Sequence, residues 1–303
     1  MKYGVKKIWT FILEVFEKFV DDRAPKYGAA LSFYTIFSLA PLLVVIIYLG
    51  GLIFGRVAAR GRVLIEIQEI MGKEGATLIQ TILKNASFSI NSPLAIIISA
   101  IAILIGSTIV FVDIQESLNL IWKVKPLPGR GMIKGFIKDR LISFIMVLGT
   151  GFLLVFTLII SAVISSINDF VSEKLFNLPA SFLQFLNISI SFVIIFIALM
   201  AIFKFLPNVL IKWKDVWVGA LVTSVMLLLG QYLIGLYLGT SSLSTTYGAA
   251  GSLVVFLLWI YYSSQILYLG AEFTHVYVEK FGDGIHPKRK FMKFEDTSVP
   301  VKN

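Results

Sequence analysis

Residues Tyr247–Val278, YGAAGSLVVFLLWIYYSSQILYLGAEFTHVYV, are long and apolar enough to cross a bilayer as one helix. Five polar side chains recur within this stretch at steps of three or four residues: Tyr261, Ser264, Gln265, Tyr268 and Glu272. That spacing places them on one face of a helix. A helix surrounded by lipid alone offers no partner for a glutamine and a glutamate. We therefore expect this face to meet the inside of a helix bundle.

The composition is that of an integral membrane protein. Of 303 residues, 57% are hydrophobic and 15% are charged, whereas a soluble domain carries about 25% charged residues. The chain has no cysteine, which excludes disulfides and cysteine-ligated metals, and it has only two histidines, His275 and His286. We interpret the net charge of +9 as the charge that retains cytoplasmic loops, and we expect no nucleic-acid partner.

Six apolar runs reach the length of about 20 residues that a spanning helix needs. They are residues 29–54, 94–112, 141–165, 182–205, 216–238 and 249–271. The predicted fold is all-α: a six-helix transmembrane domain at 29–271, preceded by an amphipathic surface helix at 1–28. An outer helical loop at 55–93 and a basic tail at 272–303 complete it.

The distribution of positive charge predicts the orientation. Six crossings put both termini on one side of the membrane. Of the 27 Lys and Arg residues, 21 lie in the termini and loops on that side and six lie on the other. We therefore predict a multi-pass protein with both termini in the cytoplasm.

Three segments outside the spans have their own interpretation. The sequence of the outer loop 55–93 predicts two short amphipathic helices with a break at Gly72–Gly75. We expect this loop to serve as a structural cap or as a lid. The loop 116–140 and the tail 272–303 are basic, so we expect membrane lipids, and anionic headgroups at the cytoplasmic face, as partners.

Ionisable residues are absent from the centres of the predicted spans. Asp113, Glu116 and Glu272 lie near cytoplasmic helix ends, and His275 is one turn beyond Glu272, close enough to touch it. One interpretation is interfacial capping and pairing with Lys or Arg. The other is a polar cytoplasmic mouth that meets a charged headgroup or exchanges a proton.

Neutral polar residues occur deeper in the predicted bundle. Helix packing explains them in one reading. In the other, they line a polar seam between the first, fifth and sixth spans, which suits the headgroup of an amphiphile. The candidates along this path are Ser32, Thr35, Ser38, Gln231, Tyr261, Gln265 and Tyr268.

The sequence predicts neither an enzyme nor a cofactor site. Two histidines, one of them in a basic tail, do not supply the converging ligands of a metal hydrolase. The G-x-S-x-G, H-E-x-x-H and Walker patterns are absent. We predict no catalytic residues and no metal.

Four motifs in order resemble the YihY/BrkB family. They are Asp21-x-x-Ala24-x-x-x-Gly28-Ala-Ala-Leu-Ser-Phe-Tyr34 with Leu39-Ala-Pro-Leu42, Asn119-Leu-Ile-Trp122, Phe205-Leu-Pro-Asn208, and Tyr247-Gly-Ala-Ala-Gly-Ser252 to Gly270-Ala-Glu272. The resemblance covers roughly residues 5–280. It implies a bacterial inner-membrane protein with six helices. Members have carried the label ribonuclease BN, regarded as mistaken, and the label of virulence or serum-resistance factors. Transport of lipids or lipid-linked glycans, and sodium–proton exchange, have been suggested for relatives.

Three functional hypotheses follow. The first is a transporter or flippase-like protein that moves an amphiphile, such as a lipid or lipid-linked molecule, along the polar seam. The second is a sodium/proton antiporter that uses Glu272 and Asp113 as exchanging carboxylates. The third is a non-transporting scaffold or envelope-assembly factor that uses loop 55–93 as its contact surface.

Overall fold

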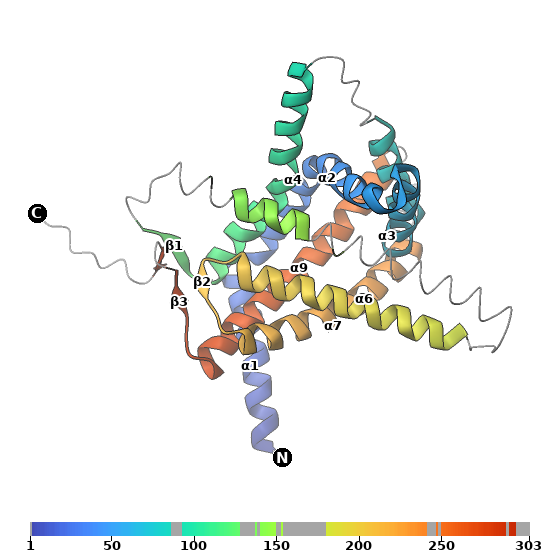
Figure 1. Cartoon of the computed structure of the whole chain (residues 1–303). Coiled ribbons are helices and arrows are strands. Elements are labelled where there is room, and N and C mark those ends of the chain that lie inside the picture. The colour runs from blue at the N-terminus through green and yellow to red at the C-terminus, as the bar shows by residue number, and fades with distance from the viewer. Residues whose placement is uncertain are drawn as a thin grey trace, which may run out of the picture.

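The structure is a computed structural model of the chain, and it describes residues 2–85, 93–127, 137, 140–149, 153, 180–240, 247, 250–288 and 291–294. Helices dominate this part of the chain, as the sequence predicted (Figure 1). The labelled helices are α1 (Lys2–Asp21), α2 (Ala24–Phe54), α3 (Arg56–Asn85), α4 (Pro93–Ile121), α6 (Ala180–Phe205), α7 (Trp213–Thr240) and α9 (Gly251–Phe281).

Four helices of the described chain are long and apolar enough to cross a membrane. They are Ala24–Ile53 of α2, Ile188–Phe205 of α6, Trp213–Tyr237 of α7 and the whole of α9. These segments coincide with four of the six predicted runs. Helix α4 is continuous through a fifth, residues 94–112. Of the run 141–165, only 141–149 and 153 are within the described residues, as part of a helical segment.

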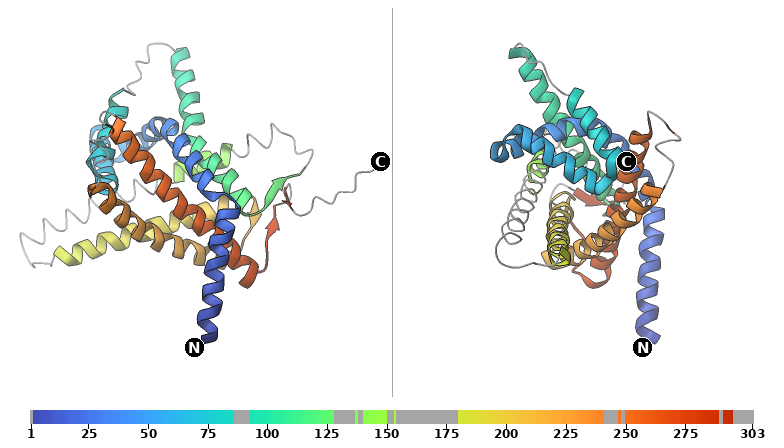
Figure 2. Two further views of the ribbon diagram at one scale, coloured as in Figure 1. Left: turned by 180° about the vertical axis from the view of Figure 1, so that it is seen from behind. Right: turned by 90° about the vertical axis from the view of Figure 1, so that its right-hand side faces the viewer.

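Helix α9 occupies the middle of the bundle. It packs against α2 on one side and against α7 on the other, with α4 beyond α2 and α6 beyond α7 (Figures 1 and 2). This arrangement explains why residues 247–278 combine a membrane-length apolar composition with a polar face. The helix has protein neighbours on two sides.

Helices α7 and α9 interlock through two reciprocal glycine–threonine contacts. Thr274 of α9 lies against Gly219 of α7, and Thr223 of α7 lies against Gly270 of α9. Each threonine hydroxyl donates a 2.7 Å hydrogen bond to the carbonyl of the glycine four residues earlier in its own helix. A Cβ atom at either glycine would overlap the facing threonine. Small residues of this kind allow membrane helices to approach closely.

A sharp break separates α1 from α2. Arg23 adopts the left-handed conformation with φ 55°, and Pro25 follows in the first turn of α2. Proline is favoured there because the missing N–H has no helical acceptor to lose. The turn between the two helices is therefore confined to Asp22 and Arg23. Beyond it, α1 packs against the C-terminal part of α9.

Helix α3 covers the opposite end of α2 and α9. Gly55 separates it from α2, and Gly72, with φ 76° and ψ −174°, breaks it into two halves, at the position where the sequence predicted a break. Both halves bury aliphatic side chains against α2 and α9, in a cluster that contains Leu39, Leu43, Ile46, Val63, Ile79, Leu83 and Phe256. The loop is thus packed onto the bundle in this structure.

Short strands join the segments at the other end, which we call the strand end. Strand β1 (Val124–Pro126) pairs antiparallel with β4 (Phe291–Lys293), and β2 (Val209–Leu210) pairs antiparallel with β3 (His286–Pro287). The chain after α9 therefore folds back onto the segments that follow α4 and α6. Of the basic residues expected in loop 116–140, Arg130, Lys134 and Lys138 lie outside the described residues.

Polar side chains of α4 fix the turn that follows α6. The Gln115 side chain donates a 2.9 Å hydrogen bond to the carbonyl of Leu206, and the Asn119 side chain accepts a 2.8 Å bond from the backbone N–H of Asn208. Lys288, next to β3, donates a 2.7 Å bond to the carbonyl of Pro207. The strand end is consequently a closely connected part of the fold, and it surrounds the end of α9.

Candidate functional site

The face of α9 opposite the glycine–threonine contacts carries a column of polar side chains. Gln265, Tyr268, Glu272 and His275 follow one another at steps of three or four residues, so they share this face. We call these four residues the polar column. Tyr268, Glu272 and His275 are buried, with at most 1% of each exposed. Gln265 is half-buried and lies against Gly28 of α2.

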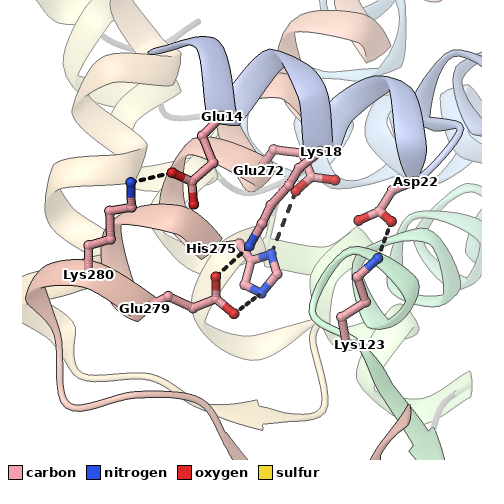
Figure 3. Close-up of polar contacts among 8 residues, drawn as sticks. All are labelled: Glu14, Lys18, Asp22, Lys123, Glu272, His275, Glu279 and Lys280. Atoms are coloured by element: carbon pink, nitrogen blue, oxygen red, sulfur yellow. Dashed lines mark hydrogen bonds and ion pairs between the residues drawn. The ribbon is translucent and has the colours of Figure 1, made fainter. Parts of the chain in front are cut away.

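Glu272 and His275 form a buried carboxylate–imidazole pair. A Glu272 carboxylate oxygen lies 3.6 Å from Nδ1 of His275, and Nε2 of His275 lies 3.3 Å from a carboxylate oxygen of Glu279. Glu279 forms an ion pair with Lys18 of α1, and its side chain is 41% exposed. Figure 3 shows the resulting series of contacts from α9 to α1. An imidazole ring thus bridges a fully buried carboxylate and a carboxylate at the surface.

The walls around the pair come from the α1–α2 break and from the end of α4. Asp22 lies beside Glu272 and pairs with Lys123, a residue of the turn that follows α4 (Figure 3). Trp122 is fully buried, and its ring centroid lies 5.4 Å from that of His275. Like-charged carboxylates this close repel each other unless one of them takes up a proton or a cation.

Many polar atoms of this region are buried without hydrogen bonds. They are both amide atoms of Gln265, the hydroxyl of Tyr268, both carboxylate oxygens of Glu272, both ring nitrogens of His275, Oδ2 of Asp22 and Nε1 of Trp122. A native interior leaves few such atoms, and a cluster of them indicates a site for water, an ion or a moving proton. The polar column has the chemistry to hold or to pass a proton.

The three hydroxyl residues predicted on the first span are buried but already bonded. Ser32 donates to the carbonyl of Gly28 at 2.8 Å, Thr35 to that of Leu31 at 2.7 Å, and Ser38 to that of Thr35 at 3.1 Å. Each of these bonds stays within α2. The hydroxyl protons are therefore occupied, and only the oxygen lone pairs face the bundle.

Gln265 and the part of α7 that holds Gln231 lie on different sides of α9. Gln265 faces α2, whereas Gly230, the neighbour of Gln231, lies against Tyr262 and Ile266 on the α7 side. Gln231 itself is half-buried on the flank of that contact. Because α9 stands between α2 and α7, the single three-helix seam expected from the sequence becomes two separate contacts. Tyr261, at the far end of the face, is 37% exposed.

The two acidic residues of α4 that the sequence singled out differ in burial. Asp113 is partly buried on the side of Tyr268, and its Oδ2 has no hydrogen bond. Glu116, one turn later, is exposed. Asp113 therefore adds a carboxylate beside Tyr268 of the polar column, and Glu116 does not.

Several residues of the site were not expected from the sequence. Glu279 continues the stripe one turn after His275, so the same spacing argument would have included it. Lys18, Asp22, Trp122 and Lys123 reach the site only through tertiary packing. Trp122 stands in a motif of the sequence, but that motif gave it no place in the site, and no local pattern marks the other three. Among the described residues, no group of three or more His, Cys, Asp or Glu is arranged to hold a metal ion.

Comparison with known protein families matches residues 15–294 to the family described as Virulence factor BrkB. The chain belongs to the BrkB family. This confirms the resemblance found in its sequence motifs, and the BrkB match covers α2 to β4 and thus most of the site.

Related BrkB-type chains are named as UPF0761 membrane proteins. One from Delftia acidovorans is 28% identical over 270 residues, which are 85% of this chain and 60% of the relative. One from Acinetobacter baylyi is 24% identical over 296 residues, 96% of this chain and 68% of the relative. One from Psychrobacter is 21% identical over 291 residues, which are 95% of this chain and 52% of the relative. The chain spans about half to two thirds of the length of these relatives. No solved structure matches it.

Proposed function

We propose that this membrane protein is a proton-coupled transporter whose proton site is Glu272. One observation carries the proposal: the Glu272 carboxylate is fully buried, neither oxygen has a hydrogen bond, and His275 connects it to Glu279 at the surface. A charge in such a place is costly unless it is neutralised, and intramembrane ionisable residues are functional in most cases.

The three side chains are arranged for a relay. A proton delivered by Glu279 binds to Nε2 of His275, and the imidazole releases the proton on Nδ1 to Glu272. One proton is thereby moved from the surface to the buried carboxylate, and no charge is left on the ring. The relay requires the contacts of 3.3 and 3.6 Å to shorten to the length of an ordinary hydrogen bond.

The cargo that the polar face suits is an amphiphile with a polar headgroup. Beyond Glu272, the polar column continues with the uncharged Tyr268 and Gln265, and the partly exposed Tyr261 lies one turn further along the same face of α9. A face whose polar groups are uncharged fits a headgroup better than a bare cation. The 21 basic residues on the side of both termini support a cytoplasmic strand end in a bacterial inner membrane.

Sodium/proton exchange is the second candidate, and Asp113 favours it. Its Oδ2 has no hydrogen bond, and Asp113 lies on the side of Tyr268, so two partly or fully buried carboxylates are available to bind a proton and a sodium ion in turn. Replacement of Asp113 by Asn separates the two functions. Exchange requires the second carboxylate, and proton-coupled movement of an amphiphile does not.

One reconstituted preparation tests the proposal. Vesicles contain a pH-sensitive dye inside and a fluorescent phospholipid in the bilayer, and either a sodium or a pH gradient is applied. We expect gradient-dependent proton movement with the wild type, and its loss with Glu272→Gln. Glu116→Gln, an exposed carboxylate on α4, is the matched control and retains it. Equal proton movement by all three proteins would contradict the proposal.

The cargo is identified in the same vesicles. A membrane-impermeant quencher reports whether the labelled phospholipid changes leaflet when the pH gradient is applied. Lipid movement that depends on the gradient supports the amphiphile, and proton movement that responds only to sodium supports exchange.

A further inference from the structure

A cluster of lysine and tryptophan side chains lies at the corner between α6 and α7. We call it the Lys–Trp corner, and it consists of Lys204, Leu210, Lys212, Trp213, Lys214 and Trp217. Trp213 is 51% exposed and Trp217 is 49% exposed, although tryptophan is among the most apolar side chains. The two residues are one turn apart on α7, so they share one side of the helix.

The aromatic part of the corner is held in place by its neighbours. Phe205 meets the Trp213 ring edge-on with 5.8 Å between centroids, and Phe196 meets Trp217 in the same way at 6.2 Å. The ammonium group of Lys204 lies 5.2 Å from the centre of the Trp213 ring and donates a hydrogen bond to the carbonyl of Ile211. The tryptophans are therefore oriented, half-exposed surfaces.

Two further lysines converge on a single oxygen atom. Lys212 and Lys214 both pair with Oδ2 of Asp283, the second of them at 3.8 Å. All three side chains are at least half exposed. The hydrogen bond and the charge of Asp283 raise the pKa of Lys212, and Lys212 in turn lowers the pKa of Asp283. The two ammonium groups thus already share one anionic oxygen, and a phosphate oxygen can occupy the same position, because lysine binds phosphate as a point charge.

The position of the corner indicates where the anion comes from. It lies at the ends of two membrane-length helices, α6 and α7, at the strand end of the molecule. Tryptophan concentrates at the level of lipid headgroups, and lysine extends its ammonium group toward the same level. An anion that reaches Lys212 and Lys214 beside exposed Trp213 is best supplied by a lipid whose glycerol and acyl parts cover the indole rings.

We propose that the Lys–Trp corner binds the phosphate headgroup of an anionic phospholipid, and that Asp283 competes with the lipid for Lys212 and Lys214. The lipid phosphate replaces the Asp283 carboxylate between the two ammonium groups, and Leu210, Trp213 and Trp217 contact its apolar part. This site is separate from the polar column and does not depend on the transport proposal.

Native mass spectrometry of the full chain in detergent, titrated with phosphatidylglycerol, tests the site. We expect the double variant Lys212→Gln/Lys214→Gln to bind the first lipid about tenfold more weakly. Asp283→Asn is expected to bind it several-fold more tightly, because the competing carboxylate is removed. A change of opposite sign in the two variants distinguishes competition from a loss of folding.

Matched variants exclude a general charge effect. Lys7→Gln/Lys26→Gln removes two exposed lysines from α1 and α2, and Glu17→Gln removes one exposed acid from α1. Both are expected to change binding less than twofold. Equal effects of the corner and control variants, equal binding of phosphatidylcholine, or displacement of the lipid by equimolar inorganic phosphate would each overturn the proposal.

Discussion

Helix α9 has two protein-facing sides that are built on opposite rules. Toward α7, glycine and threonine alternate across the contact, and each threonine hydroxyl is bonded to its own helix. Toward α1, α2 and α4, the side chains are larger and polar, and Gln265, Tyr268, Glu272 and His275 leave seven buried atoms without hydrogen bonds. The glycine–threonine contacts therefore leave no threonine hydroxyl without a hydrogen bond, whereas the polar column leaves most of its polar atoms without one.

We interpret the α7 side of α9 as the side that stabilises the fold and the polar side as the one that carries the function. Saturated hydroxyls and close backbone contacts stabilise helix pairs in a membrane, where the hydrophobic effect does not distinguish protein from lipid. Unsatisfied buried polar atoms lower stability and are retained at functional sites. We expect substitutions on the α7 side to affect folding, and substitutions on the other side to affect function.

Gly270→Val is expected to have the largest effect. The valine side chain would overlap Thr223, including its Cβ and Cγ2 atoms, so the helices must separate. Overpacking of this kind costs about 3 kcal/mol or more. Thermal unfolding in detergent, followed by circular dichroism, should show a large loss of stability or no folded protein.

Two variants sharpen this prediction. The swap Gly270→Ala/Thr223→Gly returns the missing space and should recover part of the loss seen with Gly270→Ala alone. Gly235→Ala, on the same helix as Thr223 but with open space at its Cβ position, should be neutral or slightly stabilising. Equal destabilisation by Gly235→Ala and Gly270→Ala would show that the contact with Thr223 is unimportant.

Glu272→Gln, unlike Gly270→Val, is expected to change stability little and to reduce proton movement strongly. The substitution keeps the shape of the side chain, and burial without hydrogen bonds favours the uncharged form of the Glu272 carboxyl, so the free energy of unfolding should change by less than about 1 kcal/mol. Proton movement in vesicles should fall on the order of a hundredfold, because the relay loses its acceptor. Strong destabilisation together with unchanged proton movement would assign Glu272 to the structural side of the comparison.

The sequence predicted one of these two interfaces much better than the other. The stripe of Tyr261, Gln265, Tyr268 and Glu272 follows from helical spacing alone, and so does the contact of Glu272 with His275. The glycine–threonine interface was not recognised, because its partners are on different helices and only their register reveals the pairing. The sequence also grouped Gln231 with Gln265; in the structure, Gly230 beside Gln231 contacts α9 from the α7 side, whereas Gln265 lies against Gly28 of α2.

Gly28→Ala provides an intermediate case on the polar side. The added methyl group would meet the amide of Gln265 and the hydroxyl of Ser264, which are ends of side chains, whereas at Gly270 it meets a branched Cβ. The Gln265 amide has no hydrogen bond to lose and can rotate away. We expect a loss of about 1 kcal/mol, less than for Gly270→Ala, and its recovery in Gly28→Ala/Gln265→Ala. Thermal unfolding measures both losses. A larger loss of stability for Gly28→Ala than for Gly270→Ala would contradict this prediction.

The ion pairs that hold α1 over the site should have the smallest effect on stability. Lys18 pairs with Glu279, and Glu14 pairs with Lys280, at partly exposed positions where such pairs contribute about 0.2–1 kcal/mol and are weakened by salt. A double-mutant cycle with Lys18→Ala and Glu279→Gln should therefore give a small coupling energy in unfolding experiments. Glu14→Gln is the control, since it weakens the docking of α1 without touching Glu279.

The same two variants test the relay. If Glu279→Gln slows proton movement while Glu14→Gln does not, Glu279 takes part in the relay. Equal effects would mean that α1 as a whole, and not this carboxylate, controls access to His275.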